Sequence, residues 1–119
     1  MACDIRIASE QAQFGSFELR RGMHPADGGI VRLVNTCGVG IALEMELTGE
    51  PISAQCALAA NMLSKVVHHD AMMSAAEDMA ARILRNDRRA VQRHYHRVPR
   101  GAARKRHAIR RFGAKPRSA

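Results

Sequence analysis

The carboxylate of Glu18, in the segment QFGSFELRRGMHPADGG, lies between two apolar neighbours, Phe17 and Leu19. A carboxyl group can act as a general acid or base, and burial in an apolar site raises its pKa toward neutrality. The local spacing by itself favours the ordinary arrangement, in which a charged side chain points to solvent. The segment therefore marks Glu18 as a candidate catalytic residue and leaves both arrangements open.

A turn rich in proline and glycine, Pro25 to Gly29, follows Glu18 closely in the sequence. Proline fixes φ and glycine tolerates positive φ, so the segment predicts a sharp turn. We expect a helix to begin at Gly29, where N–H groups without an intrahelical partner favour negative charge. Arg20 and Arg21 could meet a phosphate, but solvated charges beside a turn are the simpler interpretation.

Two histidines and an aspartate, His68, His69 and Asp70, raise the question of a metal site. Adjacent ligands without a third anchored partner are more typical of a helix cap, so we expect no metal. The three cysteines are widely spread and form no Cys-x-x-Cys pair, so the sequence predicts neither a zinc site nor a disulfide framework. Free thiols and the absence of a long apolar run predict a cytoplasmic protein with no membrane partner.

The elements expected to position Glu18 are short extended segments. Cys3 to Ala8 alternates in the manner of a strand, with Ile5 and Ile7 on one face. Ala12 to Phe14 and Phe17 to Leu19 predict two further extended pieces. Glu18 is therefore expected on a short strand that leads into the glycine-rich turn.

Helices dominate the rest of the predicted fold. Apolar spacing, caps and turns predict helices at 29–36, 39–47 and 54–61, a strand at 64–67 and a helix at 70–85. Gly38 suits the end of the first helix. Ser53 and Asp70 are the expected N-caps of the third and fourth. Short strands mixed with helices predict an α/β or α+β architecture.

The charge distribution divides the chain near Asp87. All 11 acidic residues lie at or before Asp87, and 12 of the 19 Lys and Arg residues follow it. We predict a folded domain over residues 1–87 and a basic, Arg-, His- and Ala-rich tail over 88–119, with at most two turns of helix at its start and disorder beyond. The excess of cations would give non-specific affinity for nucleic acid and other polyanions.

Four segments of the chain, in this order, resemble the later half of the crotonase superfamily, the enoyl-CoA hydratases and isomerases. They are CDIRIASEQAQFG, LRRGMHPADGG, ALEMELTGEPISA and SKVVHHD, and the resemblance runs from Met1 to Val91. It implies an α/β fold, here the later turns of a ββα spiral followed by a C-terminal helix. It also implies acyl-CoA thioester substrates, no cofactor apart from the coenzyme A of the substrate, and assembly into trimers or pairs of trimers.

The resemblance assigns roles to two residues. The glutamate that follows the family's AQFG segment is Glu18, which implies a catalytic carboxylate. The P-x-x-G-G turn places Ala26 where a main-chain N–H helps to hold the reacting water. Water addition to an enoyl thioester needs proton transfer and N–H donors for the thioester oxygen, and a buried carboxyl with a raised pKa suits the proton transfer.

The chain also departs from the family pattern. A second catalytic glutamate, the N–H donors and a CoA-binding loop precede the CDIRIA strand in the family, whereas that strand here begins at Cys3. Phe17 and Ala26 replace a common proline and a common glycine. We therefore expect an N-terminally truncated, catalytically incomplete fragment, and we hypothesise that the basic tail is read out of frame.

Three functions remain open at this point. The first is a fragment of an enoyl-CoA hydratase or isomerase, acting by water addition or by a double-bond shift. The second is a non-catalytic fragment that binds copies of itself or full-length family subunits. The third is a polyanion binder acting through the basic tail.

Overall fold

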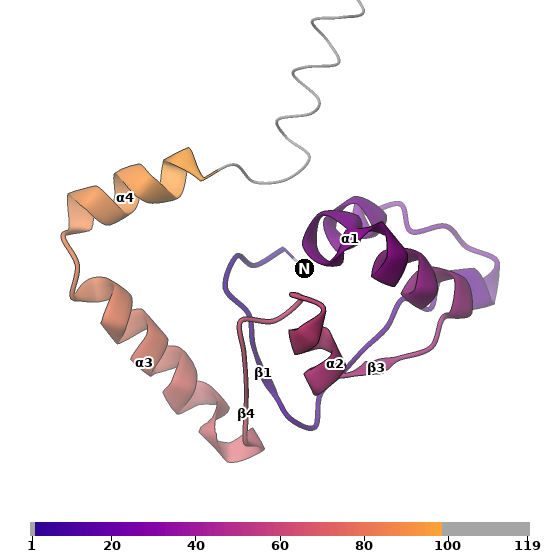
Figure 1. The fold of residues 1–119 in the computed structure, drawn as a ribbon, viewed down its shortest axis with the longest axis horizontal. Coiled ribbons are helices and arrows are strands. Elements are labelled where there is room, and N and C mark those ends of the chain that lie inside the picture. The colour runs from indigo at the N-terminus through magenta and orange to yellow at the C-terminus, as the bar shows by residue number, and fades with distance from the viewer. Residues whose placement is uncertain (1, 99–119) are drawn as a thin grey trace, which may run out of the picture.

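The computed structural model describes residues 2–98 of the 119-residue chain (Figure 1). In chain order the elements are β1 (Ile7–Ser9), β2 (Gln13–Phe14), the 3-10 helix η1 (Leu19–Arg21), α1 (Gly29–Thr48), β3 (Ile52–Ser53), α2 (Ala54–Ala59), β4 (Lys65–Val67), the 3-10 helix η2 (His69–Ala71), α3 (Met72–Leu84) and α4 (Arg88–Arg97). The predicted mixture of short strands and helices is confirmed.

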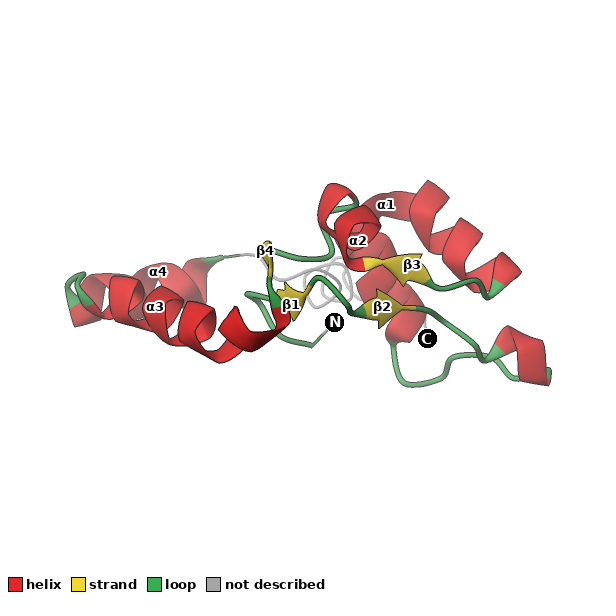
Figure 2. Ribbon diagram, turned by 90° about the horizontal axis from the view of Figure 1, so that it is seen from below, coloured by secondary structure: helices red, strands yellow, loops and turns green. Residues whose placement is uncertain are grey.

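Two small sheets join segments that are far apart in the sequence (Figure 2). β1 pairs in parallel with β4, with Ala8 opposite Val66, and β2 pairs antiparallel with β3, with Phe14 opposite Ile52. The strand predicted from Cys3 to Ala8 is wrong in its bounds, because pairing begins only at Ile7, where β4 supplies a partner.

The segment from Phe17 to Leu19 is not extended, contrary to the prediction. Glu18 has helical backbone angles, φ −62° and ψ −42°, and leads into η1. Its carbonyl oxygen accepts hydrogen bonds from the N–H groups of Arg21 and Met23, both at 3.0 Å. These local bonds close a turn where no neighbouring strand supplies ladder partners.

α1 consists of the two predicted helices, joined at a kink. Gly38 has φ 82° and ψ 168°, backbone angles that side chains with a Cβ rarely adopt. The helix begins after Gly28, which has φ 86°, and ends at Gly49, whose N–H donates to the carbonyl of Met45 at 3.0 Å. Glycine thus sets the start, the bend and the end of this helix.

The core lies between α1, α2 and the loop that leads to β4. Its members are small or flexible apolar side chains: Ala8, Leu33, Ala42, Met45, Ala54, Ala57, Met62 and Leu63. The Ser53 cap of α2 is confirmed, since its hydroxyl accepts from the Cys56 N–H at 3.2 Å. Because alanine is so frequent here, helix backbones approach closely and the core volume comes mainly from methionine and leucine.

The helix after β4 begins differently from the prediction. Asp70 does not cap it but lies inside η2, and α3 starts at Met72 after Ala71, which provides no side-chain cap. The backbone tightens into a 3-10 turn first, with the Ala71 N–H donating to the His68 carbonyl at 3.0 Å.

α4 is longer than the one or two turns expected after residue 87. It covers Arg88–Arg97, nearly three turns, and the Asp87 carboxylate caps it by accepting from the Ala90 N–H at 2.8 Å. The disorder predicted for the tail beyond this helix falls outside the described residues.

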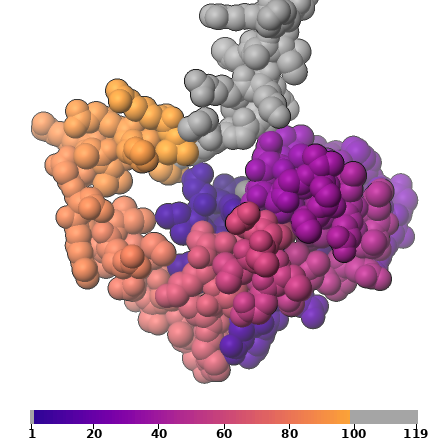
Figure 3. All heavy atoms as spheres, viewed as in Figure 1, coloured from indigo at the N-terminus to yellow at the C-terminus, as the bar shows by residue number. Residues whose placement is uncertain are grey.

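α3 and α4 form an arm that stands apart from the part of the molecule built by α1 and α2 (Figures 1 and 3). Neither helix contains a buried residue. The Tyr95 hydroxyl of the arm donates a hydrogen bond to Asp4 in the N-terminal segment at 2.8 Å. Across residues 2–98, no helix is long and apolar enough to cross a membrane.

Candidate functional site

A pocket of about 210 Å³ lies between the loop after β2, the turn from Pro25 to Gly29, and α1. Apolar side chains form much of its wall: Phe14, Leu33, Met45 and Met62. The charged residues that line it are Arg6, Glu18, Asp27 and Glu46. Three carboxylates and one guanidinium therefore share a largely apolar pocket.

Glu18 reaches this pocket from the turn before η1 and is half-buried. The Ser16 hydroxyl donates to Glu18 Oε2 at 2.8 Å. A backbone N–H of Glu18 itself and this Ser16 hydroxyl lower the pKa of the carboxyl group, while partial burial and the charge of Asp27 oppose them. The pKa raised by burial, which the sequence suggested, is therefore wrong for this structure, and Glu18 is ionised at neutral pH.

The turn places Ala26 beside the pocket. Pro25 is buried and lines the pocket together with Asp27, whereas Ala26 between them is exposed and is not part of the lining. Asp27 Oδ1 accepts from the Gly29 N–H at 2.9 Å and so fixes the turn. The Ala26 N–H makes no hydrogen bond within the part of the chain that the structure describes. It remains available to a water molecule.

Arg6 forms the side of the pocket next to the N-terminal segment. Its Nε donates to the Met62 carbonyl and its Nη1 to the Cys3 carbonyl. Its backbone N–H donates to the Ser64 hydroxyl at 3.2 Å, and the Ser64 N–H donates back to its carbonyl at 2.7 Å. Arg6 therefore acts as a brace between the N-terminal segment and the loop before β4.

Glu46 is a pocket residue that the sequence did not single out. It lies on α1, one helical turn after the fully buried Ala42, and only 6% of its surface is exposed. The apolar neighbours Met45 and Leu33 share the pocket wall with it. An acid one turn beyond a core alanine was the signal available in the sequence.

The histidine pair lies at the other end of β4, away from this pocket. His68 Nε2 is 3.4 Å from Glu10, and its Nδ1 is 3.8 Å from Asp70. His69 Nδ1 is 3.2 Å from the Ser9 hydroxyl. Among residues 2–98 there is no group of three or more His, Cys, Asp or Glu side chains placed to hold a metal ion.

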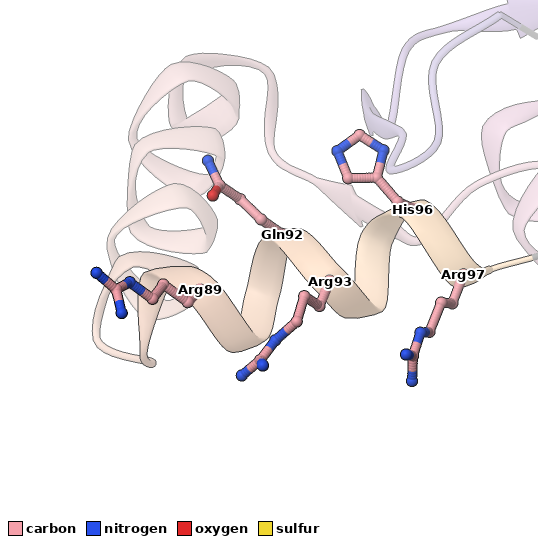
Figure 4. Close-up of a pocket in the computed structure, with 5 residues that line it drawn as sticks. All are labelled: Arg89, Gln92, Arg93, His96 and Arg97. Carbon is pink, nitrogen blue, oxygen red and sulfur yellow. The ribbon is translucent and has the colours of Figure 1, made fainter.

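A second pocket is lined by one helix, α4 (Figure 4). Arg93 and Arg97 extend from one side of the helix, and Gln92 and His96 from the other. Arg89 lies one turn before Arg93. This is a surface rich in cations, and among residues 2–98 only α4 lines it.

Comparison with known proteins supplies the family. The sequence model of the enoyl-CoA hydratase/isomerase family matches residues 1–115. The chain belongs to the enoyl-CoA hydratase/isomerase family. The match continues past Val91, where the resemblance was expected to fade.

Individual relatives agree with this assignment. The short-chain-enoyl-CoA hydratase of Clostridium acetobutylicum is 39% identical over 92 residues, which are 77% of this chain and 35% of that protein. The mitochondrial enoyl-CoA hydratase of Pongo abelii is 41% identical over 88 residues, 74% of this chain and 30% of that protein. The chain thus spans about a third of the length of these two relatives.

Solved structures of the family share the fold. The enoyl-CoA hydratase of Mycobacterium smegmatis superposes with a TM-score of 0.76 at 45% identity, covering 82% of this chain and 46% of that one. The enoyl-CoA hydratase of Mycobacterium avium superposes with a TM-score of 0.76 at 43% identity, and the match covers 82% of this chain and 45% of that one. The crotonase-like fold expected from the sequence is therefore confirmed for the matched part of the chain.

Proposed function

We propose that the pocket between Glu18, the Pro25–Gly29 turn and α1 holds the acyl thioester of an acyl-CoA. In this proposal Glu18 transfers the proton during hydration of an enoyl-CoA or a shift of its double bond. One observation carries the proposal: in a member of this family, Glu18 and the residues flanking Ala26 line the same partly apolar pocket. No cofactor is required beyond the coenzyme A of the substrate.

The protonation state of Glu18 defines its role. An ionised carboxylate accepts a proton, so in hydration Glu18 takes a proton from the water whose oxygen bonds to the β-carbon of the enoyl thioester. The α-carbon then takes up a proton, either the one held by Glu18 or one from the second carboxyl group of the family pattern. The free N–H of Ala26, next to two lining residues, holds that water in place. In a double-bond shift the same carboxylate removes a proton from one carbon of the acyl chain and returns it to another. Both reactions build negative charge on the thioester oxygen, which N–H donors must stabilise.

We further propose that this chain alone is catalytically incomplete. The family pattern places a second glutamate and the N–H donors before the CDIRIA strand, and the chain spans about a third of the length of the two relatives described above. A second polypeptide that carries those groups would complete the site. Reducing conditions suit the three free cysteines, so we propose a cytoplasmic setting.

Complementation tests the proposal. The 119-residue chain is expected to show no hydration of crotonyl-CoA by itself, and to gain activity when co-expressed with the part of the Mycobacterium smegmatis enzyme that it does not match. Glu18→Gln is expected to lower the restored rate about 10²- to 10⁴-fold, because it removes the proton acceptor. Glu50→Gln, at an exposed glutamate, is the control and should leave the rate unchanged.

Two results would contradict the proposal. Restored activity that survives Glu18→Gln would exclude Glu18 as the proton-transferring group. Turnover by the unassisted chain, lost in Glu18→Gln, would show that the chain is catalytically complete.

A second candidate is polyanion binding through α4, favoured by the exposed arginines Arg89, Arg93 and Arg97. Arginines four residues apart lie on one side of a helix, and each contact with a phosphate releases counterions. The arginines lie on a different element from Glu18, so acyl-CoA binding and polyanion binding can be separated experimentally.

A further inference from the structure

The proposed acyl pocket is lined by a carboxylate to which the proposed reaction gives no role. Glu46 is 6% exposed and lines the pocket beside Met45 and Leu33. Over residues 2–98 its carboxylate accepts no hydrogen bond and joins no ion pair. No side-chain oxygen in this range is both fully enclosed and without a partner, so the unpartnered Glu46 oxygens keep some accessible surface, and Glu46 is a lining residue of the pocket.

The neighbouring groups do not neutralise this carboxylate. Arg6 lines the same pocket, but two of its nitrogens donate to the carbonyls of Met62 and Cys3. Within residues 2–98 the other buried polar residue is Ser9, which has partners: it accepts from the Gln11 N–H at 3.1 Å and lies 3.2 Å from His69 Nδ1. Glu46 therefore differs from ordinary buried polar groups, which are satisfied within the protein.

A buried carboxylate without a partner makes a pocket selective. A purely hydrocarbon ligand that displaces water from Glu46 leaves the charge unpaired, which is costly. A ligand with a hydrogen-bond donor at that position replaces the lost water. Sites built around a buried polar group reject analogues that lack the matching group much more strongly than apolar pockets reject a change in size.

We propose that Glu46 is a specificity-determining residue, and that the pocket prefers acyl thioesters whose chain carries a hydrogen-bond donor such as a hydroxyl group. This inference rests on the proposed function, because it requires the acyl chain to enter this pocket. Glu18 then lies at the reacting end of the acyl group and Glu46 beside the chain.

Calorimetric titration of the full 119-residue chain with two matched ligands tests the proposal. The probes are butyryl-CoA and 4-hydroxybutyryl-CoA, with coenzyme A alone as the reference. The chain is expected to bind the hydroxylated thioester at least about tenfold more tightly, as a hydrogen bond to a charged group allows. Glu46→Leu is expected to remove this preference.

Two further variants separate recognition from folding. Glu46→Gln keeps the shape of the side chain and one acceptor oxygen but removes its charge. The ratio of the affinities for 4-hydroxybutyryl-CoA and butyryl-CoA should therefore fall about threefold or more, while some preference for the hydroxylated thioester remains. Glu44→Leu changes an exposed glutamate on the same helix and should keep the full preference. Circular dichroism compares the fold of each variant with that of the unaltered chain. If the Glu46→Leu variant does not fold, the binding preference of the Glu46→Gln variant decides whether Glu46 recognises the hydroxyl group.

The outcomes distinguish the two proposals. Equal binding of both thioesters, each tighter than coenzyme A, overturns the role of Glu46 and leaves the acyl pocket standing. The role of Glu46 is also overturned if the preference for 4-hydroxybutyryl-CoA over butyryl-CoA is unchanged in Glu46→Gln or in a folded Glu46→Leu variant. If neither thioester binds more tightly than coenzyme A, the proposed function fails, and the role of Glu46 with it.

Discussion

At the scale of single residues, the backbone N–H of Glu18 and then the Ser16 hydroxyl lower the pKa of the Glu18 carboxyl group. The Ser16 hydroxyl donates to Glu18 Oε2 at 2.8 Å and helps to hold the pKa of the carboxyl group below its ordinary value. A lowered pKa in the folded state contributes stability above the pKa of the unfolded chain, and this stability is lost as the pH falls through the folded value. Glu18 thus favours the folded state at neutral pH.

Ser16→Ala is expected to raise the pKa of Glu18, because the carboxylate loses a donor that favours its charged form. Carbon-13 NMR titration of the glutamate carboxyl groups measures this directly. Ser74→Ala is the matched control, since that exposed hydroxyl donates to the Ala71 carbonyl on α3. An unaltered Glu18 pKa in Ser16→Ala would show that the hydroxyl has no such effect.

Glu18 and Glu46, two of the three pocket carboxylates, differ in how far the sequence revealed them. Glu18 was recognisable because its neighbours Phe17 and Leu19 and the turn at Pro25 are local features. Glu46 was not, because its burial depends on Leu33 and Met62, which tertiary packing brings to the same pocket. The direction of the Glu18 pKa shift also depends on the Ser16 rotamer and the local backbone, which the sequence pattern does not specify.

At the scale of elements, both halves of α1 contribute residues to the candidate site. The first half starts at the turn that carries Ala26, and the second half carries Glu46. The kink at Gly38 sets the angle between them. A change in this angle would move Glu46 relative to the turn.

Gly38→Ala is expected to destabilise the fold by about 1–3 kcal/mol, because φ 82° and ψ 168° are strained for a residue with a Cβ. No atom lies within 4 Å of a Cβ at this position, so the cost is one of backbone conformation. Urea unfolding followed by circular dichroism measures it.

Gly40→Ala is the control for the kink. That glycine also has open space around a Cβ but does not have a positive φ, so alanine should stabilise the helix by about 0.5–1 kcal/mol. Equal changes in the free energy of unfolding for Gly38→Ala and Gly40→Ala would contradict a conformational role for Gly38.

Helices and caps were predictable where the signal is local. The Ser53 cap and the break at Gly38 follow from propensity and backbone freedom alone. The bounds of β1 were not predictable, because a strand extends only as far as its partner β4, which lies far along the chain. The turn at Glu18 was missed because hydrogen bonds within it outweigh the extended preference of Phe17.

At the scale of the whole molecule, the second half of α1 exposes an apolar stripe. Val39, Leu43 and Leu47 follow one another at intervals of four residues and are 59%, 45% and 70% exposed. Their spacing places them on one face of the helix. If a second copy of the chain covers this stripe, the mass measured by analytical ultracentrifugation should rise with protein concentration. A mass that does not rise with concentration in analytical ultracentrifugation would argue against self-association.

The arm formed by α3 and α4 contributes little to the core. No residue of either helix is buried, and the hydrogen bond from Tyr95 to Asp4 connects the arm to the N-terminal segment. The cations of α4 are therefore exposed on a part of the molecule distinct from the acyl pocket. Acyl-CoA carries phosphates as well as a thioester, so binding alone does not identify the surface that is used.

The most direct test of the acyl pocket is an NMR map of the nitrogen-15-labelled chain titrated with butyryl-CoA and, separately, with coenzyme A. The pocket predicts that the acyl group adds shifts at Ser16, Glu18, Asp27 and Glu46 that coenzyme A alone does not cause. Shifts confined to α4 with both ligands would instead show that the phosphates bind the basic helix, and would contradict the assignment of this pocket to the acyl thioester.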